Sequence, residues 1–317
     1  MASQAGPSSA PSAPIDRRAL AAAGITIVFW ASAFVGIRDV ADTFSPASIA
    51  LGRMAVATLA LGAVLLTQGW VRVGRRDLLL VVVSGVLWDA VYMVALNEAE
   101  RHVDAGTASM LVNTGPIFIG LFAGLFLGEG LPRRLLAGIV IAFVGSVIVG
   151  VATSSPSANG SVSTIGVVLC IVAALAYAAG VTLQKPAVRR VPALQVAWLA
   201  CLTAVVVLLP FAPALASEAS AAAPPKIGWI VFLGLFPTAL GFTTWAYALR
   251  RTSAGRLGAT TYLVPPVVIA MAWLLLGEVP PPLALVGGAI CIGGVVVVRT
   301  PRLRWPGRVT AEAGEPA

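Results

Sequence analysis

LGEGLPRRLLAGIVIAFVGSVIV (residues 127–149) recurs in altered form as LGEVPPPLALVGGAICIGGVVVV (residues 276–298), 149 residues further along the chain. Ten of the 23 aligned positions are identical. Shared apolar composition alone would not keep glycine, proline and glutamate in register, so we predict an internal duplication. Three pairs at this offset carry the prediction: Gly138 with Gly287, Gly145 with Gly294, and Pro116 with Pro265.

The composition indicates the class of protein. Hydrophobic residues make up 58% of the 317 residues and charged residues only 11%, whereas soluble domains carry roughly 25% charged residues. A helix needs about 20 mostly apolar residues to cross the hydrocarbon core of a membrane. The chain contains ten such stretches, and we predict a transmembrane helix at each: 19–37, 46–66, 78–97, 105–127, 135–151, 164–184, 192–213, 228–249, 257–276 and 282–298.

The basic residues indicate how these helices are oriented. Of the 21 Lys and Arg residues, 17 fall in the two tails and in every second connection, and three fall on the other side. Cytoplasmic loops carry the excess of Lys and Arg, so we predict that both termini are cytoplasmic. This distribution explains the net charge of +8. The sequence has no basic patch interleaved with aromatic residues, so a nucleic-acid partner is not predicted. The three cysteines lie in apolar stretches without metal-ligand spacing, so neither a disulfide nor a metal site is predicted.

The duplication divides the predicted helices into two sets of five. Because five is odd, the second set enters the membrane from the opposite face, an arrangement that recurs in secondary transporters. We therefore predict an all-α integral membrane protein of ten transmembrane helices in two inverted five-helix repeats. The predicted segments are a disordered cytoplasmic tail (1–18), the first repeat (19–151), an outer linker (152–163), the second repeat (164–298) and a basic cytoplasmic tail (299–317).

Several motifs are also similar to those of a known family. They are FWASAFVGIRD (29–39), PASIALGRMAVATL (46–59), ALNEAERHVDAGTASMLVNTGPIFIGLFAGLFLGEGL (95–131) and ALRRTSAGRLGATTYLVPPVVIAMAWLLLGE (248–278). From about residue 19 to 298 the chain resembles the drug/metabolite transporter superfamily, specifically bacterial EamA-type permeases with two EamA repeats. The resemblance implies export or exchange of small metabolites, such as amino acids, across the bacterial inner membrane. It also implies a central cavity lined mainly by the first, third, fourth, sixth, eighth and ninth spans.

Two charged residues, Arg53 and Asp89, lie well inside predicted spans. At a rise of 1.5 Å per residue both are roughly 10–12 Å below the outer surface, on helices adjacent in the sequence. An ionisable residue inside a membrane is a functional candidate by default. Asp89 is a candidate proton acceptor or contact for a substrate amine. Arg53 would then shift the pKa of Asp89 or bind a carboxylate group. The alternative is a structural ion pair that fixes helix register. Arg53 aligns with Leu199, so the second repeat lacks this arginine.

Other candidates are aromatic, polar or helix-breaking residues within the spans. Aromatic residues pack in most membrane helices, but Trp30 and Tyr177 occupy repeat-equivalent places and are the first candidates for a cavity wall. Pro116 and Pro265 each remove a helix hydrogen bond; they are either ordinary kinks or parts of gating helices. The remaining candidate cavity residues are Tyr92, Asn113, Trp245 and Tyr262, and Glu129 and Glu278 are predicted to mark helix ends on opposite membrane faces.

These features favour a carrier over an enzyme. The chain holds one histidine, so an HExxH zinc site is excluded, and it has neither a GxSxG elbow nor a phosphate-binding glycine loop. We predict a secondary transporter of small amino-acid-like or other amphipathic solutes, working by alternating access and driven by protons or exchange. A passive channel and, less favoured, a membrane-embedded enzyme are the alternatives. The expected partners are a small-molecule substrate, the lipid bilayer and protons; no cofactor is expected, and the protein is a monomer or homodimer.

Overall fold

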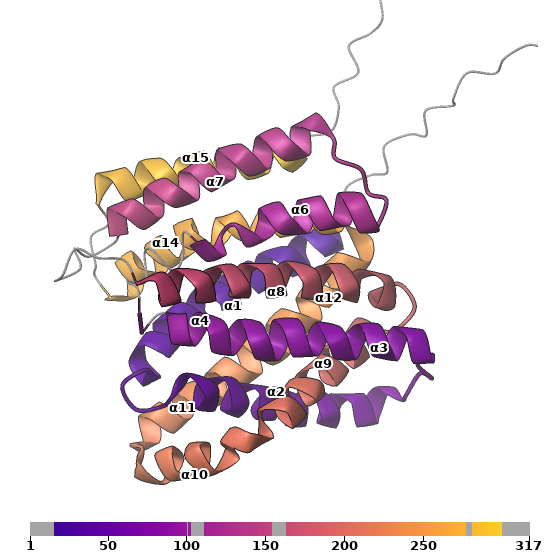
Figure 1. Cartoon of the computed structure of the whole chain (residues 1–317), viewed down its shortest axis with the longest axis vertical. Coiled ribbons are helices and arrows are strands. Elements are labelled where there is room, and N and C mark those ends of the chain that lie inside the picture. Colours follow the sequence, from indigo (N-terminus) through magenta and orange to yellow (C-terminus); the bar gives the residue numbers. More distant parts are fainter. Residues whose placement is uncertain (1–15, 100, 103–110, 154–162, 277–280, 300–317) are drawn as a thin grey trace, which may run out of the picture.

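The computed structural model describes residues 16–99, 101–102, 111–153, 163–276 and 281–299. These residues form helices joined by short turns, with no strand among them (Figure 1). Most of the predicted tails, most of the 152–163 linker and Glu278 lie outside the described residues. The described elements of the first half are α1 (Arg17–Val40), α2 (Pro46–Gln68), α3 (Arg75–Ser84), η1 (Gly85–Tyr92), α4 (Met93–Ala99), α6 (Gly115–Phe126) and α7 (Arg133–Thr153).

The second half repeats much of this order. Its elements are α8 (Thr164–Val188), α9 (Ala193–Leu208), η2 (Leu209–Phe211), α10 (Ala212–Ala221), α11 (Pro224–Leu233), η3 (Gly234–Leu240), α12 (Gly241–Arg251), α13 (Ala254–Thr260), η4 (Thr261–Leu263), α14 (Val264–Leu276) and α15 (Pro282–Arg299).

Seven helical stretches among the described residues are long and apolar enough to cross a membrane. Over the described residues the chain is therefore all-helical, with several helices of the length and composition found in multi-pass membrane proteins. The other three predicted spans are helical over most of the residues described for them, in α1, in α6, and from α13 to α14, but they are not in that set. The seven stretches are Pro46–Gln68, Arg75–Ala99, Arg133–Ala152, Thr164–Val188, Ala193–Ala221, Pro224–Arg251 and Pro282–Arg299.

Two π-helical segments, η1 and η3, interrupt equivalent helices of the two halves. Their first residues, Gly85 and Gly234, are 149 positions apart. Each glycine allows close packing against the other half, since an added Cβ at Gly85 would lie 2.8 Å from the carbonyl oxygen of Ala200. At Gly234 the added Cβ would lie 2.9 Å from the carbonyl oxygen of Arg53. The halves thus interlock through α9 against η1 and α2 against η3.

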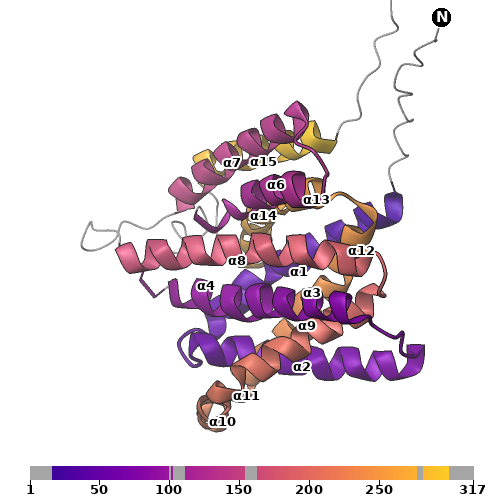
Figure 2. The ribbon, with the colours of Figure 1, turned by 45° about the vertical axis from the view of Figure 1, so that its right-hand side comes forward.

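α7 and α15 lie side by side in both ribbon views and pack through glycines (Figures 1 and 2). A Cβ added at Gly138 would lie 2.7 Å from the carbonyl oxygen of Gly294, and one added at Gly145 would lie 2.6 Å from that of Gly287. The lower-numbered glycine of each helix meets the higher-numbered glycine of the other, so the helices run antiparallel. Because these glycines are repeat equivalents, the contact has the reciprocal pattern of a two-fold axis.

Two side-chain contacts lie on this local axis, because each joins a residue to its own repeat equivalent. The Cys291 thiol lies 3.4 Å from the Ala142 carbonyl oxygen as a donor, and the Tyr262 hydroxyl donates to the Asn113 carbonyl oxygen at 2.9 Å. Both pairs are separated by 149 residues, the offset of the sequence repeat. The duplication read from the sequence is therefore also a spatial relationship between α7 and α15 and between their neighbours.

Candidate functional site

Aromatic side chains from four elements of both halves meet in the centre of the structure. Trp30 comes from α1, Trp88 and Tyr92 from η1, Tyr177 from α8, and Phe242 and Trp245 from α12. We call these six residues the aromatic cluster. Trp88, Tyr177, Phe242 and Trp245 are buried, and Trp30 and Tyr92 pack against them as partly buried residues.

The rings of the aromatic cluster are in direct contact. The centroids of Trp30 and Trp245 are 5.0 Å apart, and Trp88 stacks on Phe242 at 5.1 Å. Tyr177 lies 5.4 Å from Trp88 and 5.6 Å from Tyr92. Such ring pairs stabilise a core beyond the area they bury. Four of the predicted cavity residues, Trp30, Tyr92, Tyr177 and Trp245, are therefore brought together, and their rings fill the centre in this conformation.

The cluster contains polar atoms without partners. The indole nitrogens of Trp30 and Trp245 are buried, and neither makes a hydrogen bond to any described residue. Buried indole N–H groups usually find an acceptor. The two donors therefore remain available to an acceptor that enters between the rings.

Asp89 follows Trp88 directly and is 1% exposed. Both of its carboxylate oxygens are buried, and neither has a hydrogen-bond partner among the described residues. A lone ionised carboxylate in such a setting is very costly, whereas a protonated carboxyl group is tolerated far better. Asp89 is therefore placed where gain or loss of a proton would change the local energetics strongly.

Arg53 is 3% exposed and lies on α2. Its Nε donates to the Thr238 hydroxyl at 2.9 Å, and its Nη1 lies 3.7 Å from the Met93 sulfur. No ion pair within 4 Å joins Arg53 to Asp89 in the described part of the chain, although the two groups still influence each other electrostatically. The partnership between them stays a prediction; in this conformation Arg53 pairs with η3 of the other half.

The remaining predicted site residues that the structure describes lie outside the aromatic cluster. Tyr262 is fully buried in a separate cluster with residues of α7 and α15, where its hydroxyl meets Asn113. Pro116 and Pro265 each occupy the first turn of a helix, α6 and α14, directly after a tighter turn. In that position a proline gives up no internal hydrogen bond of its own helix. That Pro116 and Pro265 belong to helices that move during gating stays a prediction.

Glu129 reaches across to the second half. Its two carboxylate oxygens accept the backbone N–H groups of Ala254 at 2.9 Å and Gly255 at 3.2 Å, at the beginning of α13. Carboxylates stabilise helix N-termini in this way. Beside it, the Lys185 ammonium donates to the carbonyl oxygens of Leu249 and Thr252, at the end of α12. Glu129 therefore ties the ends of helices from different halves, beyond marking its own helix end.

Three residues that were not selected from the sequence belong to this site: Trp88, Thr238 and Phe242. Thr238 could have been found, because adding the repeat offset of 149 to Asp89 gives Thr238. Phe242 carried no such signal, since an isolated phenylalanine in an apolar helix is typical of ordinary packing.

Comparison with known proteins shows what most of the chain is similar to. The model of the EamA-like transporter family matches residues 17–151 and 164–300. The chain is 39% identical to a protein of Streptantibioticus cattleyicolor named "Probable terminal-alkyne amino-acid exporter", over 86% of this chain and 91% of that protein. It is 26% identical to the pseudopaline exporter CntI of Pseudomonas aeruginosa, over 81% and 87% of the two chains. A solved crystal structure matches with a TM-score of 0.75 over 89% of this chain and 96% of that chain, at 19% identity, which shows the shared fold alone.

Proposed function

The chain belongs to the EamA-like transporter family, and from that premise we propose that it is a secondary transporter exporting small amino-acid-like or other amphipathic metabolites. The names of two relatives, "Probable terminal-alkyne amino-acid exporter" and "Pseudopaline exporter CntI", support export as the direction. We place it in the inner membrane as ten helices in two inverted repeats, with both termini cytoplasmic. The match at two consecutive segments supports the two repeats.

One observation carries the proposed site: the buried carboxyl group of Asp89, which has no hydrogen-bond partner among the described residues, lies next to Trp88 of an aromatic cluster built from both halves. Charged groups inside membrane proteins mark proton relays and substrate pathways. In the proposed cycle Asp89 binds a proton in one state and releases it in the other, or exchanges it for a substrate amine. Arg53 keeps a positive charge on the same half and would attract a substrate carboxylate.

The aromatic cluster supplies the apolar wall of the proposed binding site. The rings of Trp30 and Trp245 would separate to admit a substrate, and their indole N–H groups, which have no acceptor among the described residues, would then donate to it. Movement of one half against the other about the local axis would open this region to each face in turn. Pro116 and Pro265, at the first turns of α6 and α14, would serve as flexible points of that movement.

Transport by purified protein in liposomes tests this function. We expect labelled apolar amino acids to be taken up against their gradient when a proton gradient is imposed, with saturation and with counterflow by unlabelled substrate. Conductance far above carrier turnover would instead indicate a channel. Release of metabolites from cells that overexpress the protein, compared with cells lacking it, would identify the exported compound.

A further inference from the structure

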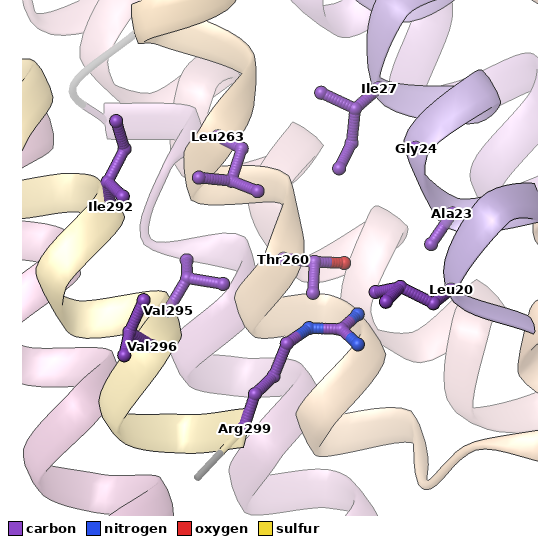
Figure 3. A pocket seen from close by; sticks show the side chains of 10 residues that line it. All are labelled: Leu20, Ala23, Gly24, Ile27, Thr260, Leu263, Ile292, Val295, Val296 and Arg299. Atoms are coloured by element: carbon purple, nitrogen blue, oxygen red, sulfur yellow. The ribbon is translucent and has the colours of Figure 1, made fainter. Parts of the chain in front are cut away.

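A groove opens between the two halves at the end of the bundle where α1 begins and α15 ends (Figure 3). Its volume is about 420 Å³, within the range of about 300–1,000 Å³ typical of small-molecule sites. One wall is the stretch of α1 from Leu20 to Ile27, and the other is the stretch of α15 from Ile292 to Arg299. Thr260 and Leu263 form its floor between these helices.

The walls of the groove are aliphatic except at one end. The Thr260 hydroxyl already donates to the Leu257 carbonyl oxygen at 2.5 Å, so it offers little to a ligand. Among the described residues that line the groove, Arg299 is the one that carries a charge, and Figure 3 shows its guanidinium extending toward Thr260 and Leu20. A long apolar slot with a cation at its end fits an amphiphile that has a hydrocarbon tail and an anionic head.

A second cation lies close to the first. Arg256 lies in α13, which packs against α15, and its positive charge acts on that of Arg299. Among the described residues, neither arginine forms an ion pair. Two close cations without a described counter-charge favour an anion between or beside them.

The cation is not required by the fold. The repeat offset of 149 places Gly150 at the position equivalent to Arg299, so the first half carries no charge there. The equivalent helix, α7, therefore forms without an arginine at this position. Arg299 is therefore a feature of one end of the molecule, the end that the distribution of basic residues predicts to face the cytoplasm.

We propose that this groove binds one anionic phospholipid, with an acyl chain along the aliphatic walls and the phosphate at Arg299 and Arg256. Burial of a hydrocarbon chain and pairing of the phosphate with two arginines supply the binding energy. Basic pockets between transmembrane helices on the cytoplasmic side are common sites for anionic lipids. The walls come from opposite halves, so, on the basis of the proposed alternating-access function, the bound lipid favours the conformation seen here.

Retention of lipid by the purified full-length protein, measured by native mass spectrometry, tests this site. The protein is incubated in detergent with phosphatidylglycerol or, separately, with phosphatidylcholine carrying the same acyl chains. We expect one tightly retained phosphatidylglycerol and no equivalent retention of phosphatidylcholine. Arg299→Gln should weaken retention about fivefold, the effect of removing one basic residue near an anionic lipid.

A second variant tests the apolar part of the groove. An added Cβ at Gly24 meets no atom within 4 Å, and Gly24 lines the groove, so we expect the side chain of Gly24→Leu to occupy the slot and abolish retention. Gly228→Leu is the matched control, because Gly228 is also open and lies on α11 away from the groove. Arg76→Gln removes an exposed arginine elsewhere and controls for net charge.

The outcomes separate this proposal from the transport function. Equal retention of both lipids, or equal loss in the groove variants and in their controls, would overturn the lipid site. Because the assay needs no transport, it gives the same answer in a protein that fails to export any amino acid. If Gly24→Leu does not fold, Arg299→Gln against Arg76→Gln still decides the question.

Discussion

The interface of α2 with η3 and the interface of α9 with η1 are equivalent under the repeat, yet they carry different chemistry. Gly234 packs against the Arg53 carbonyl and Val56, and Gly85 packs against the Ala200 carbonyl and Thr203. The side chains then diverge. Arg53 donates to Thr238 at the first interface, whereas at the second Ala200 takes the place of the arginine and Asp89 takes the place of the threonine.

The two interfaces therefore share the same backbone packing, while the polar side chains have diverged between the two repeats. An arginine at position 200 would have given Asp89 a cationic partner in the same geometry in which Arg53 meets Thr238. Its absence leaves Asp89 without a hydrogen-bond partner among the described residues. The structural alignment by contact also refines the sequence alignment, because Ala200, one residue beyond Leu199, is the residue that corresponds to Arg53.

The largest effect is expected on proton-driven uptake, from a change at Asp89, where the two interfaces differ most. Asp89→Asn keeps the shape of the side chain but cannot exchange a proton, so proton-driven uptake should fall to the level of protein-free liposomes. Helical content by circular dichroism and yield in the membrane should not change. Proton-driven uptake that persists unaltered in the variant would remove Asp89 from the coupling role.

The close backbone packing that the two repeats have in common can be tested at the glycines of α7 and α15. Gly145→Ala places a Cβ 2.5 Å from the backbone nitrogen of Cys291 and 2.6 Å from the Gly287 carbonyl oxygen. Because both atoms are backbone, relief requires the helices to separate, and we expect a loss of about 2–3 kcal/mol in unfolding free energy, as for other overpacked cores.

Gly294→Ala is the repeat-equivalent test, since its Cβ would lie 2.4 Å from the Ala142 backbone nitrogen. Both variants are measured by denaturation in mixed micelles, with Gly228→Ala as the open-site control. A local two-fold predicts similar losses for the two glycines. A large loss at one glycine and none at the other would contradict the equivalence of the two helices.

A smaller loss of unfolding free energy is expected at Thr238, whose hydroxyl accepts a hydrogen bond from Arg53. Thr238→Val removes the acceptor of the buried Arg53 Nε and should cost about 1.5 kcal/mol, as expected for a hydrogen bond to a charged group. Thr203→Val at the other interface removes a hydroxyl that donates within its own helix, to Leu199 at 2.7 Å, and should cost less. Equal losses for the two variants would mean that Arg53 gains nothing from Thr238.

The helices and the repeat could be predicted from the sequence because both rest on local patterns. Apolar length predicts a membrane helix, and glycine, proline and glutamate in register predict the duplication. The four glycines paired in the sequence turned out to form the contacts of α7 with α15, with the partners exchanged: Gly138 meets Gly294, and Gly145 meets Gly287. The π-helical segments could not be predicted in this way, since their residues are as apolar as those of the α-helical segments around them.

The candidate site was predictable only in part. Trp30, Tyr92, Tyr177 and Trp245 were selected individually, and the structure places them in one cluster. The partner of Arg53 was not predicted, because proximity along the sequence favoured Asp89 on the next helix. Which helix faces which depends on how the halves interlock, and no sequence period encodes that.

The smallest effect on stability is expected at one of two ion pairs near helix ends, which also correspond under the repeat with their charges exchanged. Lys226 bridges to Asp42 at 3.1 Å where α11 begins, and Arg190 bridges to Asp77 at 2.8 Å where α3 begins. Positions 77 and 226 are 149 apart, and positions 42 and 190 are 148 apart. The ion pair thus recurs with the acid and the base reversed between the halves.

The pair at Asp42 has a consequence for pH dependence. The hydrogen bond from Lys226, together with one from Thr43, lowers the pKa of Asp42 below its ordinary value of 3.8. A carboxyl group whose pKa is lowered by folding contributes stability above its unfolded pKa and loses it as the pH falls through the folded value. We expect Lys226→Gln to return the Asp42 pKa toward 3.8, measured by carbon NMR of the carboxyl group, and to change stability little because the contact is exposed. Arg190→Gln, at the corresponding pair, should leave the Asp42 pKa unchanged, and a shift there would show that the two pairs are coupled through the bundle.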